Sequence, residues 1–184
     1  MTAERPDLKI EKFISVESSA RLEDLIKIYV EVYSDQLDDP FFSAPRYRER
    51  LEGYSSRSGF SVALGYVDSN IIGYALGYTL PAGSGWWSGL RSRVPSDITA
   101  ENGNRTFALN EIMVLEQWRR RHYARELHDA LLADRSEERA TLLVLPGNTP
   151  ACKAYKAWNW HKLGELKPFN DSPVYDAMIR PLKG

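Results

Sequence analysis

The stretch that decides the fold is residues 107 to 132, FALNEIMVLEQWRRRHYARELHDALL. It combines an apolar run, an arginine-rich turn and an amphipathic helical pattern, in that order. A helix start leaves backbone N–H groups without partners and carries the positive end of the helix dipole, so it attracts anionic oxygens. Guanidinium groups add fixed positive charge there, from Arg119, Arg120, Arg121 and Arg125. The junction predicts a phosphate-binding turn; a solvated basic turn is the alternative interpretation.

A second informative stretch follows at residues 141 to 164, TLLVLPGNTPACKAYKAWNWHKLG. Its first five residues, 141–145, are nearly all apolar and precede a Pro-Gly pair, which is typical of a strand buried on both faces. Thr149 can cap the following helix, and Pro150 falls where a first-turn proline is tolerated. One face of that helix is a packed stripe of Ala151, Ala154, Tyr155 and Trp158.

Together these stretches resemble the GNAT superfamily of acyl-CoA N-acyltransferases, whose cofactor turn has the pattern Gln/Arg-x-x-Gly-x-Gly/Ala. Arg119 fills the first position and Ala124 the last, while His122 replaces the middle glycine. The resemblance covers about two-thirds of the chain, from the hairpin near residue 59 to the C-terminus. It implies an α/β (α+β) GNAT fold, with a central mixed, mostly antiparallel sheet of about six to seven strands flanked by about four helices. Residues 1–184 are expected to form a single N-acetyltransferase domain.

The resemblance also implies acetyl-CoA as co-substrate. Backbone groups of Ile112, Met113 and Val114 would bind the pantetheine arm, together with Asn148 and Ala151 at the start of the later helix. The pyrophosphate would be held by the turn, at Arg119, Arg120, Arg121, His122, Tyr123, Ala124 and Arg125. Glycine lets a backbone approach a ligand or adopt a left-handed conformation. We therefore expect His122 to be compatible with binding if its backbone is already helical.

Two residues are candidates for acid–base catalysis. Alternation along the strand from Phe107 to Leu115 places Glu111 on the face of Met113, so its carboxylate is expected to be partly desolvated. Burial raises a carboxylate pKa, which suits a general base near neutral pH. By the resemblance, Tyr155 would protonate the leaving thiolate. The alternatives are a structural glutamate paired with an arginine and a core tyrosine with a satisfied hydroxyl.

The acceptor residues are expected in the least regular loops. Asp35 and Asp38 lie beside Phe41 and Phe42, and carboxylates next to aromatic rings can attract a cationic amine. The other interpretation is an acidic, solvated turn whose phenylalanines dock into the core. Residues 81–105 form a long irregular connection, and its two tryptophans, Trp86 and Trp87, could be an apolar lid or could pack against a neighbouring helix.

The remaining elements follow from periodicity. Helices are expected at Ala20–Tyr33 and Pro45–Tyr54, and strands at Leu8–Val16, Phe60–Val67, Ile71–Leu80 and Val174–Ile179, with a hairpin turn at 68–70. Gly164 and residues 170–173 are expected as turns around two final strands, and His161 as the start of the terminal hairpin. His128 is predicted to be exposed on the polar side of its helix.

Composition excludes several classes of protein. A net charge of −1 argues against a general nucleic-acid binder, and no apolar segment is long enough to cross a membrane. The charged amino terminus lacks a signal-peptide core, so a cytoplasmic location is the default expectation. Cys152 is the only cysteine and there are three histidines without close spacing, so no metal site is predicted.

The sequence thus predicts an N-acetyltransferase that moves an acetyl group from acetyl-CoA to a primary amine by direct attack, with a small molecule as the expected acceptor. The main alternative is a non-catalytic GNAT-fold module that binds CoA or a protein partner, and His122 in the glycine position is its best support. A nucleic-acid module is a weaker alternative, because no stacking platform accompanies the arginines. Pairing into a homodimer through the terminal strands is common in the family and is left open here.

Overall fold

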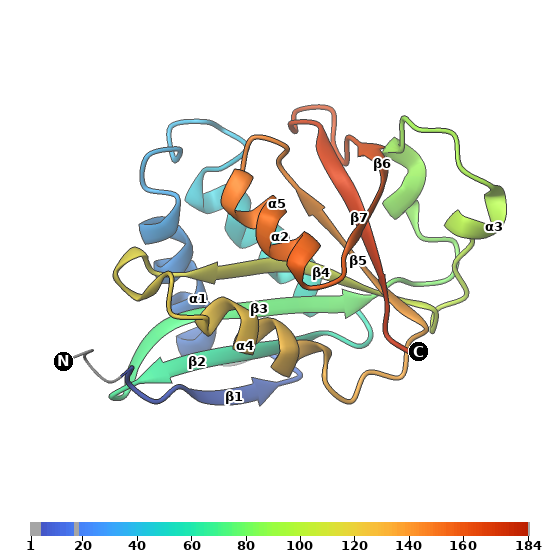
Figure 1. Ribbon diagram of the computed structural model, residues 1–184. Helices are drawn as coiled ribbons and strands as arrows, with labels where there is room; N and C mark the ends of the chain where they lie inside the picture. Colours follow the sequence, from blue (N-terminus) through green and yellow to red (C-terminus); the bar gives the residue numbers. More distant parts are fainter. Residues whose placement is uncertain (1–4, 17–18, 184) are drawn as a thin grey trace. The chain divides into compact units, whose positions relative to one another are not determined.

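The structure, a computed structural model, describes residues 5–16 and 19–183 (Figure 1). The amino-terminal half contains β1 (Lys9–Phe13), α1 (Ser19–Val32), α2 (Ala44–Ser55), β2 (Ser61–Val67) and β3 (Asn70–Thr79). Two short helices, η1 (Gly85–Gly89) and α3 (Ser96–Thr99), lead to β4 (Thr106–Val114), η2 (Glu116–Trp118) and α4 (Tyr123–Leu132). The chain ends with β5 (Arg139–Val144), α5 (Thr149–Ala157), β6 (His161–Leu166) and β7 (Tyr175–Pro181).

The strands form a seven-stranded sheet in the order β1-β2-β3-β4-β5-β7-β6. β4 runs parallel to β5, whereas β1–β2, β2–β3, β5–β7 and β6–β7 are antiparallel. The sequence prediction of a mixed, mostly antiparallel sheet is therefore confirmed. The structure has five α-helices where about four were expected, and the additional one, α3, is a single turn inside the irregular 81–105 segment.

Two compact units can be distinguished along the chain. The first contains the residues up to Tyr78 and Glu111–Asp134, and the second contains Thr79–Asn110 and the residues from Arg135 onward. Strand β4 begins in the second unit and ends in the first, so Glu111 opens the part of β4 that belongs to the first unit. Each unit is described separately below, and the single domain stays a prediction.

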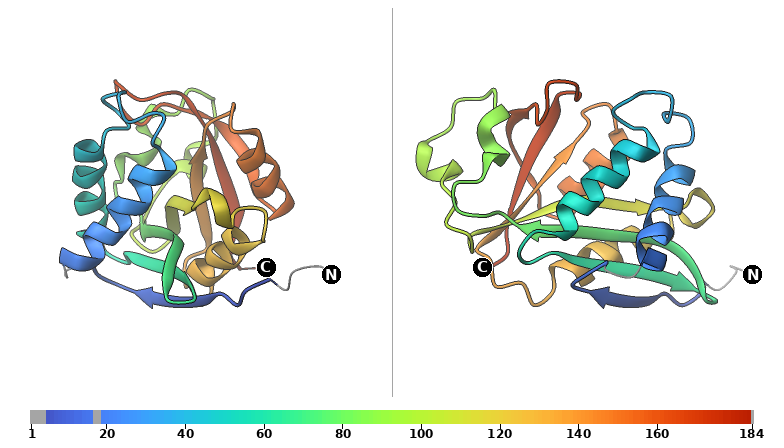
Figure 2. Two further views of the ribbon diagram at one scale, coloured as in Figure 1. Left: turned by 90° about the vertical axis from the view of Figure 1, so that its left-hand side faces the viewer. Right: turned by 180° about the vertical axis from the view of Figure 1, so that it is seen from behind.

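In the first unit, helices cover both faces of the strands (Figure 2, left). Alternation along β2 explains this, because Val62 and Leu64 join the core cluster formed with α1 and α2, while Gly65 turns to α4. A Cβ atom at Gly65 would lie 3.1 Å from the Leu127 side chain, so the missing side chain allows α4 to pack closely on β2. The hairpin between β2 and β3 turns at Asp68 and Ser69, both left-handed, as two-residue hairpins require.

In the second unit, β5, β7 and β6 lie side by side, and the loop after η1 adds to the edge of β6. Leu90 forms an antiparallel bridge with Leu166, and the Lys167 amide donates to the Gly89 carbonyl at 3.0 Å. A Cβ atom at Gly89 would lie only 1.9 Å from the Lys167 carbonyl oxygen, so this close approach needs glycine. The edge of β6 is thereby covered by the loop.

Buried polar contacts fix the irregular 81–105 segment. The Glu101 carboxylate, whose side chain is 1% exposed, is paired with Arg139 at 3.0 Å and accepts hydrogen bonds from Trp87 Nε1 and Thr106 Oγ1. The Arg139 guanidinium also donates to the Ile98 carbonyl at 2.6 Å. The segment was predicted as irregular, and these contacts explain how it is ordered without regular secondary structure.

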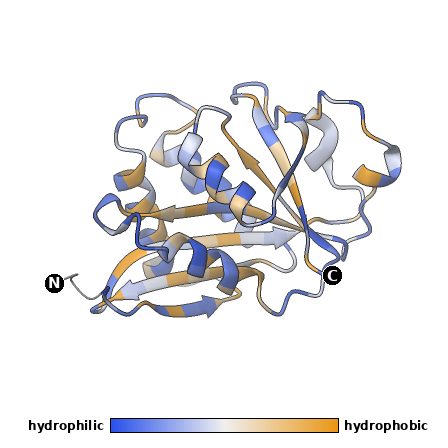
Figure 3. Cartoon of the chain, viewed as in Figure 1, coloured by the Kyte–Doolittle hydropathy of each residue, from blue (hydrophilic) through white to orange (hydrophobic). Residues whose placement is uncertain are grey.

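Hydrophobic residues are concentrated on the inner strands β4 and β5, whereas β1 and the loops are largely hydrophilic (Figure 3). No helix within the described ranges is long and apolar enough to cross a membrane.

Three local predictions were wrong. His128 is fully buried rather than exposed, because it lies between Leu127 and Leu131 on a wider apolar face of α4. Gly164 lies within β6 and not in a turn, where a Cβ atom would collide with Ser92 at 2.5 Å. The cap of α5 is Asn148 and not Thr149.

Candidate active site

Glu111 is the only candidate carboxylate of the acid–base set, and the structure places it among aromatic rings in the first unit. The phenol groups of Tyr29, Tyr47 and Tyr74 all interact electrostatically with it. Although the residue is only partly buried as a whole, desolvation of its carboxyl group raises the pKa to about 7, against an opposing attraction from Arg50. The predicted desolvation of Glu111 is therefore confirmed, and its carboxylate can accept a proton near neutral pH.

The tyrosines around Glu111 form an ordered stack. The rings of Tyr29 and Tyr47 lie 3.7 Å apart and are nearly parallel, and the Tyr47 and Tyr74 hydroxyls are hydrogen-bonded at 2.5 Å. Burial raises the pKa of Tyr29 to about 12 and raises those of Tyr47 and Tyr74 well above the ordinary value. These phenols stay neutral at physiological pH, so Arg50 is the charged neighbour that acts on Glu111.

The turn predicted to bind phosphate lies between η2 and α4, also in the first unit. His122 precedes α4 with φ 65° and ψ 4°, and Arg120 has φ 60°. The backbone at His122 is thus left-handed, and the condition stated for it, a helical backbone, is not met. A left-handed backbone is the conformation that the glycine of the family pattern adopts readily. Histidine tolerates this region better than most residues. The His122 side chain makes no capping hydrogen bond, so it does not occupy the first-turn amides of α4.

The arginines of the turn differ in their contacts. Arg119 Nε donates to the Val114 carbonyl at 3.0 Å, which ties the turn back to the end of β4. The Arg121 guanidinium lies 5.4 Å from the centre of the Trp118 ring, and Arg125 pairs with Asp129 at 2.6 Å. All of Arg119, Arg120 and Arg121 are exposed, so their positive charge faces solvent beside the first turn of α4.

The end of β4 that was predicted to bind pantetheine is packed closely. A Cβ atom at Gly73 would lie 2.3 Å from the Met113 carbonyl oxygen, and Leu115 donates to the Ile72 carbonyl at 2.9 Å. Met113 is buried in the core cluster, whereas Ile112 is partly exposed on the alternate side of the strand.

The second unit supplies Asn148, Ala151 and Tyr155. The Asn148 side-chain oxygen accepts from the Ala151 amide at 3.3 Å and so caps α5, which leaves its amide NH2 as the group that can donate to a ligand. Tyr155 is 7% exposed, and its ring lies 5.7 Å from Trp158 and 6.1 Å from Trp160. Tyr155 thus has the aromatic packing of the core interpretation.

The acceptor candidates fall on both units. In the first unit, Asp35 and Asp38 are exposed, while Phe41 and Phe42 are buried as the packing interpretation expected. In the second unit, Trp87 is buried and anchored to Glu101, so it packs and is not exposed as a lid would be. Trp86 is partly exposed and lies edge-on to Trp87 at 6.4 Å.

Sequence reasoning missed three residues around Glu111: Tyr47, Arg50 and Tyr74. The available signals were the i, i+3 spacing of Tyr47 and Arg50 on one helix and the tyrosine at the centre of an apolar strand. Neither signal names a partner, because these residues meet Glu111 only through contacts distant in sequence.

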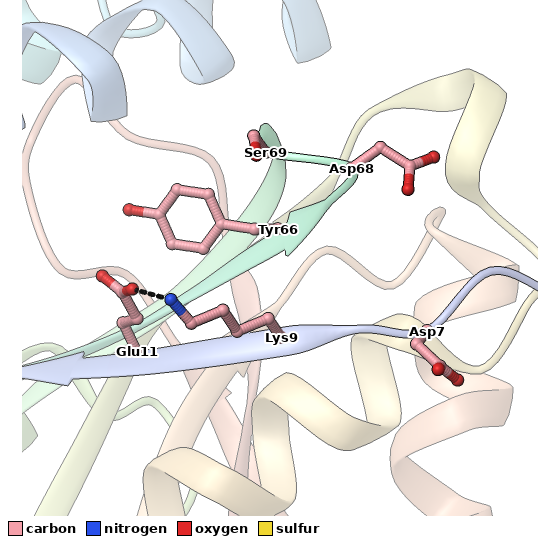
Figure 4. A pocket seen from close by; sticks show the side chains of 6 residues that line it. All are labelled: Asp7, Lys9, Glu11, Tyr66, Asp68 and Ser69. Atoms are coloured by element: carbon pink, nitrogen blue, oxygen red, sulfur yellow. Dashed lines mark hydrogen bonds and ion pairs between the residues drawn. The ribbon is translucent and has the colours of Figure 1, made fainter.

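A shallow pocket elsewhere in the first unit carries no comparable chemistry. It is lined by Asp7, Lys9, Glu11, Tyr66, Asp68 and Ser69 (Figure 4). The Lys9 ammonium already pairs with the Glu11 carboxylate at 2.6 Å at this surface. Within the described residues, no group of three or more metal-ligating side chains is found.

Comparison with known proteins decides the family. Residues 22–160 match the model of the acetyltransferase (GNAT) family, which is more than half of the chain. The chain belongs to the GNAT acetyltransferase family. It is an acyltransferase, with acetyl-CoA as co-substrate. A search of curated proteins finds no match.

Solved structures of this GNAT protein's relatives share its fold at low sequence identity. A GNAT-family acetyltransferase from Staphylococcus aureus Mu50 is 17% identical with a TM-score of 0.62, covering 96% of this chain and 100% of its own. Ard1 from Thermoplasma volcanium is 16% identical with a TM-score of 0.63, covering 96% and 99%. An aminoglycoside N-acetyltransferase in complex with CoA is 15% identical with a TM-score of 0.55, covering 85% and 90%.

Proposed function

We propose that this protein transfers the acetyl group of acetyl-CoA to the primary amine of a small molecule by direct attack. The observation that carries the proposal is Glu111, whose desolvated carboxyl group has a pKa of about 7. An ammonium must lose a proton before its nitrogen can attack, and a base that titrates near the working pH does this most effectively. A purely structural carboxylate would instead be held ionised by hydrogen bonds.

The co-substrate supplies the acetyl thioester. Its pyrophosphate fits the turn before α4, because the left-handed His122 leaves the first-turn amides uncapped and three exposed arginines lie beside them. We assign pyrophosphate contacts to Arg119–Arg125 and pantetheine contacts to backbone groups of Ile112–Val114. The free amide NH2 of Asn148 and the start of α5 at Ala151 complete the proposed cofactor set.

Two side chains, Glu111 and Tyr155, transfer protons in the proposed reaction. The Glu111 carboxylate takes a proton from the acceptor nitrogen, and the Tyr155 hydroxyl gives a proton to the departing sulfur. A small cationic acceptor is favoured by the exposed carboxylates of Asp35 and Asp38. The GNAT relative that is an aminoglycoside N-acetyltransferase is similar to this chain in fold, which is in line with such an acceptor.

The test is a screen of amines with acetyl-CoA, followed by Tyr155→Phe on the best acceptor. We expect acetyl-CoA-dependent acetylation of at least one small amine, and a fall in kcat of about 10²-fold or more in the variant with little change in CoA affinity. Trp158→Phe is the matched control, because it alters the aromatic packing on Tyr155 and leaves the hydroxyl in place. Equal losses in both variants would reduce Tyr155 to a packing residue.

The alternative of a non-catalytic module predicts CoA binding without turnover for every amine. Titration calorimetry of the wild-type protein with CoA and with pantetheine measures cofactor binding, because pantetheine lacks the pyrophosphate and the nucleotide. Tight binding of CoA but not of pantetheine would show that binding needs the pyrophosphate-linked nucleotide, as the contacts proposed at the turn before α4 require. Binding combined with inactivity across the screen would favour the non-catalytic module.

A further inference from the structure

Arg50 lies on α2, and its contacts hold the loop between α1 and α2. Its Nη1 donates to the Phe41 carbonyl at 2.7 Å, and its Nη2 donates to the Tyr29 hydroxyl at 3.4 Å. The Tyr29 hydroxyl in turn donates to the Phe42 carbonyl at 2.9 Å. Two consecutive carbonyl groups of the loop are therefore held by one connected pair of side chains.

The same guanidinium lies among the rings around Glu111. It lies 4.8 Å from the centre of the Phe41 ring and 5.6 Å from that of Tyr47, which stacks on Tyr29. Tyr47 is hydrogen-bonded to Tyr74. Tyr29, Tyr47 and Tyr74 belong to one core cluster with Met113 of β4, so the rings link α1, α2, β3 and β4.

We propose that Arg50 is a positioning residue for the reaction, which holds the acceptor loop at Phe41 and Phe42 and brings its positive charge to the rings of Phe41 and Tyr47. This inference rests on the proposed function, because it assigns Glu111 the role of base. The charge acts on Glu111 through the attraction that opposes desolvation. Arg50 itself touches no reacting atom and is not a catalytic residue.

The other titratable groups of the cluster come from α1, the loop between α1 and α2, α2 itself and β3. They are Tyr29 and Tyr33 on α1, Asp39 in the loop, Tyr47 and Tyr54 on α2, and Tyr74 on β3. Burial raises the pKa values of Tyr29, Tyr47 and Tyr74, so these phenols remain neutral around pH 7. Asp39 Oδ1 accepts from the Phe41 amide at 2.9 Å and is exposed to water, which screens its charge.

The test measures Glu111 directly by carbon NMR of protein labelled at glutamate carboxyl groups, with Glu111→Gln to assign its signal. In Arg50→Gln we expect the Glu111 midpoint to rise by about one pH unit, and kcat/KM on the acid side of the profile to fall about tenfold. In Arg50→Lys the positive charge remains, while the two hydrogen bonds of the guanidinium, to the Phe41 carbonyl and the Tyr29 hydroxyl, are lost together. We expect its midpoint to stay near the wild-type value and KM for the amine to rise about threefold to tenfold.

Arg48→Gln is the matched control, because Arg48 lies on the same helix but pairs with Glu23 at the surface, at 2.7 Å. It should change neither the Glu111 midpoint nor KM. If the Glu111 midpoint is raised in the wild type but does not move in Arg50→Gln, the role of Arg50 is overturned and the base assignment stands. An ordinary midpoint in the wild type would instead overturn the base assigned in the proposed function, so the two failures are distinguishable. Circular dichroism checks that each variant is folded.

Discussion

Glu111 and Glu137 are both withdrawn from water, one in each compact unit, and their surroundings have opposite effects on the carboxyl group. Desolvation raises the pKa of Glu111 to about 7 because only the attraction of Arg50 opposes it. Desolvation acts on Glu137 too, but hydrogen bonds from Arg135 and Thr79 outweigh it and lower the pKa. Glu137 accepts from Arg135 Nε at 3.0 Å and from Thr79 Oγ1 at 2.6 Å, and a further contact joins it to Arg135 Nη2.

The comparison shows what separates a carboxylate that can exchange protons from one that supports the fold. The charge of Glu137 is satisfied by a bidentate contact with the Arg135 guanidinium. That guanidinium also lies 4.0 Å from the centre of the Phe107 ring. Glu111 is surrounded by neutral phenols and has a single charged neighbour. The chemistry of acetyl transfer needs the second arrangement, because a fully paired carboxylate is too weak a base.

The largest effect is expected from Glu111→Gln. Loss of a positioned general base lowers turnover by about 10²-fold to 10⁴-fold, while the neutral amide suits the desolvated surroundings. Steady-state kinetics at pH 7 on the best acceptor measures the loss. Turnover within twofold of the wild type would show that Glu111 and Glu137 do not differ in function.

Glu137→Ala should act on stability and not on turnover. Removing one partner of a buried ion pair leaves the Arg135 charge without compensation and costs about 3–5 kcal/mol. For a chain of this length that corresponds to a fall in melting temperature of roughly 10 °C. Calorimetry at pH 7 measures it, with Glu138→Ala as the control at the exposed neighbouring position. A melting temperature equal to that of the control would contradict the pairing.

The two glutamates should also give opposite dependences of stability on pH. Since the folded-state pKa of Glu111 lies above the ordinary glutamate value of 4.5, the folded state binds the extra proton, and stability falls as pH rises from about 4.5 to 7. The contribution amounts to about 3 kcal/mol and is absent in Glu111→Gln. Glu137 has a lowered pKa, so its contribution is present above the unfolded value and is lost as pH falls through the folded one. Urea unfolding between pH 4 and 8 on the wild type and Glu111→Gln tests the first slope.

The smallest effect is expected from Thr79→Val. This change keeps the shape of the side chain and removes two hydrogen bonds, the one that Thr79 Oγ1 donates to Glu137 and the one that it accepts from Arg135 Nη2 at 3.1 Å. It should cost about 1–2 kcal/mol and bring the pKa of Glu137 closer to that of an ordinary glutamate. Urea unfolding at pH 7 measures the cost. An unchanged free energy of unfolding would show that Arg135 alone holds Glu137.

Much of the fold could be predicted because its patterns are local. Alternation predicted the β2–β3 hairpin, and the structure confirms it. Thr149 and Pro150 marked the start of α5 within one residue. Such signals depend on neighbouring residues alone, so they survive in a single sequence.

The rest depends on contacts between distant residues. Glu137 lies in a polar turn of the sequence, and nothing there indicates that Thr79, 58 positions earlier, donates to it. The pairing of Glu101 with Arg139 across 38 positions is equally hidden. His122 shows a different limit, because its left-handed backbone is set by the turn and not by its own preference.

The most direct measurement is carbon NMR titration of the glutamate carboxyl groups in the wild-type protein, with Glu111 and Glu137 assigned by single Gln variants. We expect a Glu111 midpoint at about pH 7 and a Glu137 midpoint below the ordinary glutamate value in the same sample. Similar midpoints near the ordinary value for both residues would contradict the claim that Glu111 is the poised base.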